Sequence, residues 1–116
     1  MKYLVFCEDA ASRRQIEDLL SATSLPHESV SLERLLVKGA TEGYTAVVTE
    51  HETWQRNVSI LRYFDCLDAV NQKPMLVFSK LRRQGGVKLR RTRAATLYSP
   101  LPAYARDVQP MLLQLA

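Results

Sequence analysis

The sequence has few cysteines. Cys7 and Cys66 are the only two in 116 residues, and no CxxC or Cys/His spacing surrounds them. Two cysteines are too few for the disulfide framework of a small secreted domain, and the missing spacing excludes the usual structural zinc sites. We expect two reduced thiols, with Cys7 at the end of a strand and Cys66 in the middle of a helix. The sequence predicts no metal site and no cofactor.

Long apolar runs are also missing. No stretch approaches the ~18 residues that a membrane-spanning helix needs. The apolar stretch within residues 1–10 is too short, and too soon followed by acids, for a signal peptide. There is no low-complexity segment and no long linker. We expect residues 1–116 to form a single cytoplasmic domain without membrane contact, long enough to bury one core.

Acidic residues are absent from residues 80–93, although the rest of the chain, with nine basic and twelve acidic residues, is mildly acidic. The seven basic residues of this segment are Lys80, Arg82, Arg83, Lys88, Arg90, Arg91 and Arg93. Three interpretations stay open: a solvated loop, a surface for an acidic protein partner, or a site for nucleic acid or a nucleotide. The segment has no aromatic residue on which bases could stack, which argues against nucleic acid.

Five short apolar runs predict buried strands. They cover residues 2–7, 27–30, 45–49, 75–78 and 95–98. Apolar residues at helical spacing predict four helices, the first two with Ser12 and Ser31 as their N-caps. The helices cover residues 13–22, 32–38, 53–71 and 104–115. This alternation predicts an α/β fold: a flavodoxin-like, doubly wound, five-stranded parallel sheet in the order 2-1-3-4-5.

Polar side chains stand where these strands end. In open α/β sheets the ligand site lies just past the carboxyl ends of the strands. The candidate site residues are therefore Cys7, Glu8, Asp9, Glu50, Ser79 and Ser99. His51 follows Glu50 directly, and we expect it to be a solvated loop residue because the sequence places no cluster of metal-type ligands around it.

Residues 2–20, KYLVFCEDAASRRQIEDLL, resemble the first strand–helix unit of bacterial response-regulator receiver domains, most closely that of the single-domain chemotaxis receivers. The shared features are an apolar strand, an acidic pair, and a helix that begins near Arg-Arg and contains Leu-Leu. Pro100 after the fifth strand agrees as well, and the similarity extends loosely over the whole chain. The resemblance implies the receiver fold and a role in two-component signal transduction.

In that family, an acidic pair after the first strand and an aspartate after the third bind Mg²⁺, and this aspartate accepts a phosphoryl group. A hydroxyl after the fourth strand and a lysine before the strand-five proline contact the phosphate, and an aromatic on strand five moves with the switch. The matching residues here are, in that order, Cys7 with Glu8, Glu50, Ser79, Ser99 and Thr96, with Asp9 one position after the pair.

These replacements predict a receiver that does not accept phosphate. Cysteine is a soft, poor ligand for Mg²⁺, and glutamate places its carboxylate one methylene further out than aspartate does. Ser99 cannot supply the positive charge of the lysine, so the acids would face one another without a cation. Two alternatives remain: an atypical phosphoacceptor that uses Glu8, Asp9 and Glu50 with Mg²⁺, or a permanently active-like domain in which Glu50 mimics the phosphorylated state.

The sequence therefore predicts a degenerate, non-enzymatic receiver that binds a protein partner independently of phosphorylation. The resemblance implies a contact face that combines the receivers' fourth helix, on which residues 80–93 would fall, with the fifth strand and the receivers' fifth helix, here residues 104–115. There the basic residues of 80–93 and Tyr98 would contact the partner, or a second copy of the chain in a homodimer. The alternative function is binding of nucleic acid or a nucleotide through residues 80–93, which would depend steeply on salt.

Overall fold

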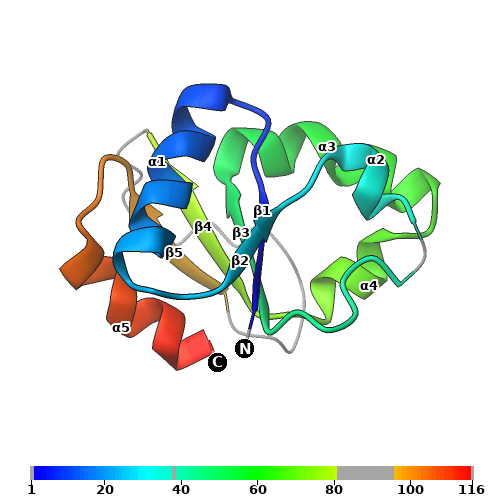
Figure 1. Ribbon diagram of the computed structural model, residues 1–116. Helices are drawn as coiled ribbons and strands as arrows, with labels where there is room; N and C mark the ends of the chain where they lie inside the picture. The colour runs from blue at the N-terminus through cyan, green and yellow to red at the C-terminus, as the bar shows by residue number, and fades with distance from the viewer. Residues whose placement is uncertain (1, 38, 81–95, 116) are drawn as a thin grey trace.

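A parallel five-stranded sheet forms the centre of the computed structural model, which describes residues 2–37, 39–80 and 96–115. The strands are β1 (Tyr3–Phe6), β2 (His27–Ser29), β3 (Ala46–Glu50), β4 (Met75–Ser79) and β5 (Thr96–Pro100). They are hydrogen-bonded in the order β2-β1-β3-β4-β5 (Figure 1), and every neighbouring pair is parallel. The predicted strand order and the doubly wound α/β fold are confirmed.

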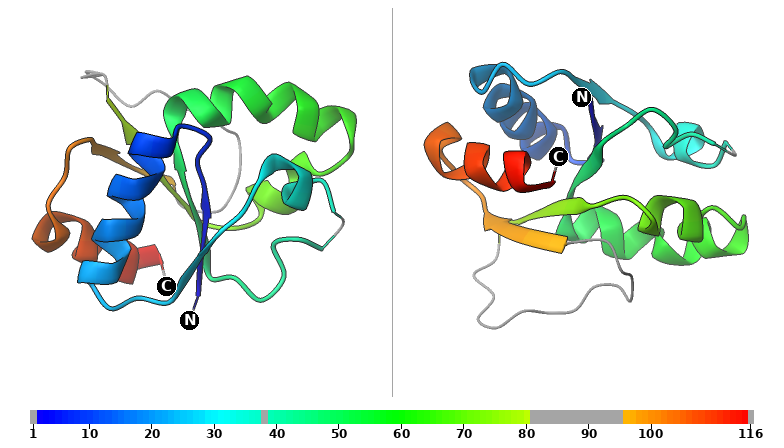
Figure 2. Two further views of the ribbon diagram at one scale, coloured as in Figure 1. Left: turned by 45° about the horizontal axis from the view of Figure 1, so that its top comes forward. Right: turned by 90° about the horizontal axis from the view of Figure 1, so that it is seen from below.

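Helices cover both faces of this sheet (Figure 2). They are α1 (Ala10–Ala22), α2 (Leu32–Leu35), α3 (His51–Tyr63), α4 (Leu67–Asn71) and α5 (Ala105–Leu115). Side chains alternate along a strand, so a strand that is apolar at every position serves two cores. In β1, Tyr3 and Val5 pack with α1 and α5, whereas Leu4 and Phe6 pack with α2, α3 and α4. The uninterrupted apolar runs therefore produce the three-layer architecture.

Helix α1 begins at Ala10 rather than at Arg13, and its N-cap is Asp9. The Asp9 Oδ2 accepts a hydrogen bond of 3.0 Å from the backbone N–H of Ser12. The prediction that Ser12 is the cap is wrong, because aspartate caps a helix as well as serine does and stands earlier in the chain. Ser31 caps α2 as predicted, with its Oγ accepting from the Arg34 N–H at 3.3 Å.

The long helix expected over residues 53–71 is instead two helices, α3 and α4, separated by a turn. Asp65 has a left-handed backbone with a φ of 57°, which ends α3 because an α-helix of L-residues cannot continue through it. The prediction that Cys66 lies in the middle of a helix is therefore wrong. Cys66 immediately precedes α4. Its thiol donates to the carbonyl oxygens of Leu36 and Phe64 at 3.5 and 3.3 Å.

Trp54 holds α3 on the sheet, because its side chain is only 1 % exposed and lies in the core with Phe6 and Val77. Of the predicted contact face, the helix expected between β4 and β5 falls in residues 81–95, which lie outside the described residues. Within the described part of the chain, no helix has the length and apolar character that crossing a membrane requires.

Candidate functional site

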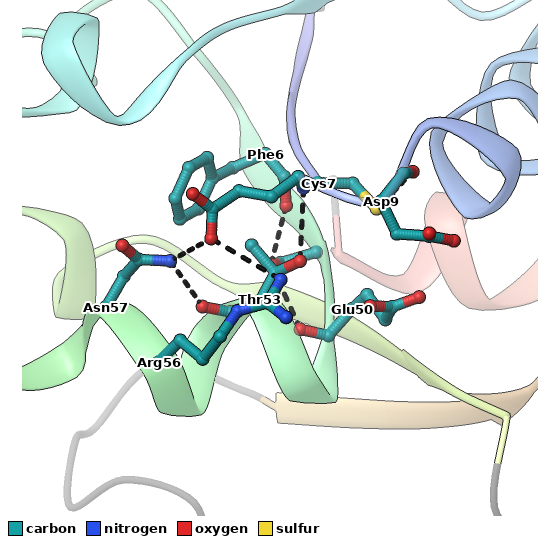
Figure 3. Close-up of polar contacts among 9 residues, drawn as sticks. Phe6, Cys7, Asp9, Glu50, Thr53, Arg56 and Asn57 are labelled. Carbon is teal, nitrogen blue, oxygen red and sulfur yellow. Dashed lines mark hydrogen bonds and ion pairs between the residues drawn. The ribbon is translucent and has the colours of Figure 1, made fainter.

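The carboxyl ends of the central strands lie side by side at one edge of the sheet, and several residues singled out in the sequence meet there. Cys7 and Glu8 follow β1, Glu50 is the last residue of β3, and Ser79 is the last residue of β4. Figure 3 shows the side chains of Cys7, Asp9 and Glu50 extending to the same side of this edge. The edge site, as we name it, consists of Cys7, Glu8, Asp9, Glu50 and Lys80.

Glu8 is held by helix α3. Its Oε1 accepts a hydrogen bond of 2.6 Å from Nδ2 of Asn57 and lies 3.5 Å from the guanidinium of Arg56 (Figure 3). Its backbone N–H donates to Oγ1 of Thr53 at 3.1 Å. Asn57 is itself 2 % exposed and also donates to the carbonyl oxygen of Thr53 at 2.7 Å. The carboxylate that the resemblance assigns to Mg²⁺ therefore already has two donors from one helix.

Asp9 is paired with a lysine from another strand end. Nζ of Lys80, directly after β4, lies 2.9 Å from Oδ2 of Asp9, the same oxygen that caps α1. The hydrogen bond from the Lys80 ammonium, together with the one from the Ser12 backbone N–H, holds the pKa of Asp9 well below its usual range. In return, Asp9 raises the pKa of Lys80, and the negative charges of Glu50 and Glu52 raise it further.

The sequence predicts that Glu8 and Glu50 face one another without a cation, whereas the structure places Arg56 3.5 Å from Glu8 and Lys80 on the neighbouring Asp9. In receivers the lysine stands at the end of the fifth strand, whereas Lys80 reaches Asp9 from the end of β4. Neighbouring parallel strands end at the same edge, so a long side chain from either strand can reach the same carboxylate. Lys80 was grouped with the basic contact residues. The structure places its ammonium in the edge site, while its side chain stays 49 % exposed.

Glu50 is deeply buried, with 2 % of its surface exposed, and its Oε2 has no hydrogen-bond partner among the described residues. Buried polar atoms of this kind are uncommon in native proteins, so core packing does not explain this carboxylate. His51 is also 2 % exposed, and its prediction as a solvated loop residue is wrong. The reason is that α3 begins at His51 itself, without a loop after β3.

Cys7 contributes a neutral thiol to the edge site. Burial, with the negative charge of Glu50 adding to it, raises the pKa of Cys7 to about 11. Its Sγ donates to the backbone carbonyl oxygen of Asp9 at 3.5 Å. Because the thiolate is the nucleophilic and metal-binding form, a neutral thiol serves neither purpose at neutral pH. A position that bears an acid in receivers therefore adds no negative charge here.

The other predicted site residues lie on β4 and β5. Ser79 is half-buried at the end of β4, and Ser99 is buried within β5 with its Oγ donating to the Pro100 carbonyl at 3.3 Å. Tyr98 is 38 % exposed on β5, and Thr96 begins that strand. The remaining basic residues lie outside the described residues, so the nucleic-acid alternative stays a prediction. They are Arg82, Arg83, Lys88, Arg90, Arg91 and Arg93.

The chemistry of the edge site follows from these contacts. Among residues 2–37, 39–80 and 96–115, no three His, Cys, Asp or Glu side chains are arranged to hold a metal ion. Mg²⁺ needs oxygen ligands in nearly octahedral geometry. Here Glu8 is bound to α3, Asp9 is bound to Lys80 and Cys7 is uncharged. The arrangement favours an edge neutralised by the protein's own cations.

Three residues of this network were missed in the sequence: Thr53, Arg56 and Asn57. Thr53 and Asn57 are four residues apart on the helix after Glu50, so they share one helix face, and this spacing could have identified them. No local signal predicts that Arg56 pairs with Glu8, because the two residues are brought together only by the packing of α3 beside β1.

No family model matches the chain, and no curated protein matches it. Among solved structures, the chain is similar to the crystal structure of a response regulator in red light signalling of R. palustris. This similarity has a TM-score of 0.55 at 13 % sequence identity and covers 99 % of this chain and 91 % of that chain. The chain has the response-regulator receiver fold. At this identity the likeness shows the fold alone, and function has to be argued from the side chains.

Proposed function

We propose that this chain is a phosphorylation-independent, receiver-like signalling domain of the cytoplasm that acts by binding a protein partner. The receiver fold supports a role in signal transduction. The observation that carries the proposal is the ion pair between Lys80 and Asp9, with 2.9 Å between Nζ and Oδ2. An internal ammonium is placed on the acid that directly follows Cys7 and Glu8, the positions at which a phosphate-accepting receiver would be expected to bind a metal ion.

The ion pair replaces the neutralising effect of a metal and removes the need for one. Lys80 compensates the charge of Asp9 and joins the N-terminus of α1 to the end of β4. A divalent cation would have to displace this ammonium and also detach Glu8 from Asn57, which donates at 2.6 Å. Both steps cost favourable charge-assisted hydrogen bonds, so the site gains little from Mg²⁺.

Glu50 at the acceptor position supports the same proposal. Phosphoryl transfer depends on an in-line approach of donor and acceptor oxygen atoms. Glu50 is 2 % exposed, which leaves almost no surface for such an approach. Its longer side chain also displaces the carboxylate, and a displacement of about 1 Å can cost on the order of a hundredfold in rate.

A domain that does not switch by phosphorylation acts through the surfaces it presents. The described part of the predicted contact face includes two exposed aromatic side chains, Tyr98 on β5 and Tyr104 just before α5, which are 38 % and 68 % exposed. Aromatic residues are enriched where proteins bind one another. These side chains support a protein partner as the output of the domain.

Intact-mass spectrometry after incubation with Mg²⁺ and acetyl phosphate tests this function. We expect no phosphoryl adduct on this protein, under conditions in which a phosphate-accepting receiver is modified. We also expect the thermal unfolding temperature to be the same with Mg²⁺ and with EDTA, since a ligand that binds only the folded state would raise it. An adduct that disappears in the Glu50→Gln variant would contradict the proposal and establish the atypical phosphoacceptor.

A further inference from the structure

A cavity of about 240 Å³ opens between helix α2 and the turn that joins α3 to α4. On the α2 side it is lined by residues 35–37 and 39–41, and on the other side by residues 64–66, 69 and 70. None of these residues belongs to the edge site. Figure 2 shows α2 and α4 on the same face of the sheet, opposite the face that α1 and α5 cover. We name this feature the α2/α4 cavity.

The mouth of the α2/α4 cavity is apolar and exposed. Val37 and Phe64 line it and are 50 % and 54 % exposed. Tyr63, next to Phe64, is 82 % exposed, and the two rings stack edge to face with their centroids 5.0 Å apart. Isolated exposed apolar side chains are ordinary, but apolar side chains gathered around a concave feature are typical of a binding site.

Two backbone turns with left-handed residues form part of the cavity wall. Asp65 has a φ of 57° at the end of α3, and Gly39 has a φ of 82° in the segment after α2. Both residues line the cavity. A Cβ atom at position 39 would meet the carboxylate of Glu42 at 3.4 Å, so glycine allows this acidic side chain to lie against the cavity wall.

One acidic residue lines the apolar mouth, and two more lie close to its lining residues. Asp65 lines the cavity, the Glu42 carboxylate lies against Gly39, and Asp68 directly precedes the lining residue Ala69. Among the lining residues that the structure describes there is no lysine or arginine, and Lys38, between Val37 and Gly39, lies outside the described residues. The surface therefore combines an apolar centre with an acidic rim, and it complements a partner that has an apolar residue between basic ones.

The size of the cavity favours an inserted protein side chain over a free small-molecule ligand. Pockets for free drug-sized ligands measure about 300–1,000 Å³, and this cavity is smaller at about 240 Å³. A cavity of this size suits one or two inserted side chains, the usual anchors of a protein interface. We infer that the α2/α4 cavity is the docking site of a protein partner that inserts a bulky aliphatic side chain flanked by lysine or arginine. This inference rests on the proposed function, because it names the partner chemistry of an interaction domain.

Selection from a phage-displayed library of random linear peptides tests the inference on the full chain. We expect the enriched peptides to share a leucine, isoleucine or methionine with neighbouring lysine or arginine. Fluorescence anisotropy with a labelled peptide of that consensus should then show saturable binding. Replacing the aliphatic residue of the peptide by alanine should weaken binding about tenfold or more, since anchors dominate interface energetics.

Three variants of the protein locate the binding site. Ala69→Trp fills the cavity from an exposed helix position and should abolish binding, whereas Ala22→Trp adds the same side chain at an exposed position of α1 and should leave it unchanged. Asp65→Asn with Glu42→Gln removes two rim charges and should weaken binding and its salt dependence. Asparagine is chosen at position 65 because it tolerates the left-handed backbone. Circular dichroism of each variant confirms that it is folded.

The outcomes separate this inference from the proposed function. No enriched consensus, an acidic consensus, or binding that survives Ala69→Trp would overturn the inference. Loss of binding in Tyr104→Ala but not in Ala69→Trp would place the partner on the β5/α5 side, contradicting the inference while the proposed function stands. Self-association that sedimentation shows in the wild type but not in Ala69→Trp would identify the occupant as a second copy and overturn the partner chemistry inferred here. A phosphoryl adduct would overturn the proposed function whatever the peptides do.

Discussion

Two regions of this protein differ in whether their side chains already have partners within the chain. At the edge site, acidic side chains are matched by partners from the chain itself: Asn57 for Glu8, and Lys80 for Asp9. At the α2/α4 cavity, the apolar ring of Phe64 stays 54 % exposed beside a cavity of about 240 Å³. Apart from the buried Oε2 of Glu50, the acidic groups of the edge site have partners within the chain, whereas the apolar mouth of the cavity is left uncovered.

The difference indicates where a ligand can still contribute free energy. Polar groups that are already hydrogen-bonded gain little from a new partner, because binding exchanges one set of bonds for another. Covering exposed apolar surface contributes roughly 25 cal/mol of favourable binding free energy per Å². The function proposed above therefore places partner binding on the surface of the helices rather than at the strand ends.

The largest effect that we expect is a loss of stability at alkaline pH, caused by the buried thiol of Cys7 in the edge site. The pKa of its thiol is about 11 in the folded protein, against an ordinary value of 9.0. Between these pH values the unfolded chain releases a proton that the folded protein keeps, so the free energy of unfolding falls as the pH rises. The whole effect is about 3 kcal/mol, from 1.36 kcal/mol per pKa unit, and about 2 kcal/mol of it falls between pH 9 and pH 11. Urea denaturation at pH 9 and pH 11 measures it.

The Cys7→Ala variant is the control for this titration. It is less stable than the wild type at neutral pH because it leaves a small cavity, but its stability declines less between pH 9 and pH 11. Burial also raises the pKa of Tyr3, and since both proteins contain Tyr3, the difference between them isolates Cys7. The same alkaline decline in both proteins would show that the thiol is not buried beside Glu50.

A smaller loss of stability is expected when the α3 side chains that contact Glu8 are removed. Asn57→Ala removes two buried hydrogen bonds, to Glu8 at 2.6 Å and to the Thr53 carbonyl at 2.7 Å, and should lower the free energy of unfolding by about 1–3 kcal/mol. Arg56→Ala removes an exposed ion pair of 3.5 Å and should cost less than about 1 kcal/mol. Urea denaturation of both variants compares them. Equal, small losses would mean that Glu8 is not fixed by Asn57, and the edge site would then be more open than we describe.

The sheet could be predicted from the sequence because strands such as Met75–Ser79 are apolar at almost every position, as burial on both faces requires. The break between α3 and α4 could not. Leu61 before the turn and Val70 after it pack in the same core, so the apolar spacing reads as one helix. Only the left-handed backbone of Asp65 separates the two helices, and periodicity does not report a single dihedral angle.

The place of the edge site could also be predicted, because topology brings strand ends together whatever the side chains are. The pairing within it could not. Lys80 and Asp9 lie far apart in the sequence, and their contact depends on how far a long side chain reaches across neighbouring strands. No pattern in the sequence predicts the α2/α4 cavity. It lies between α2 and the turn that joins α3 to α4, and its presence depends on how these segments pack in three dimensions.

The substitution with the smallest expected effect on stability, Lys80→Met, tests whether Lys80 neutralises Asp9 in the edge site. In Lys80→Met the pKa of Asp9 should rise toward its ordinary value, because the first of the contacts that depress it is lost. Carboxyl ¹³C NMR across a pH titration measures this directly. In the wild type, the depressed pKa of Asp9 stabilises the fold above the unfolded-state pKa of about 3.9, and this stabilisation is lost as the pH falls. The variant should therefore show a weaker decline of stability in acid.

Lys2→Met is the matched control, because Lys2, directly before β1, forms an ion pair of the same length, 2.9 Å, with Glu28 of β2. It should leave the Asp9 titration unchanged. The global stability of Lys80→Met at neutral pH should change little, since both side chains of the pair are more than 40 % exposed and solvent screens them. An Asp9 pKa that stays low in Lys80→Met would mean that the Ser12 N–H alone holds the carboxylate ionised. The edge site would then lack its internal cation, and the contrast with the uncovered cavity would lose its physical basis.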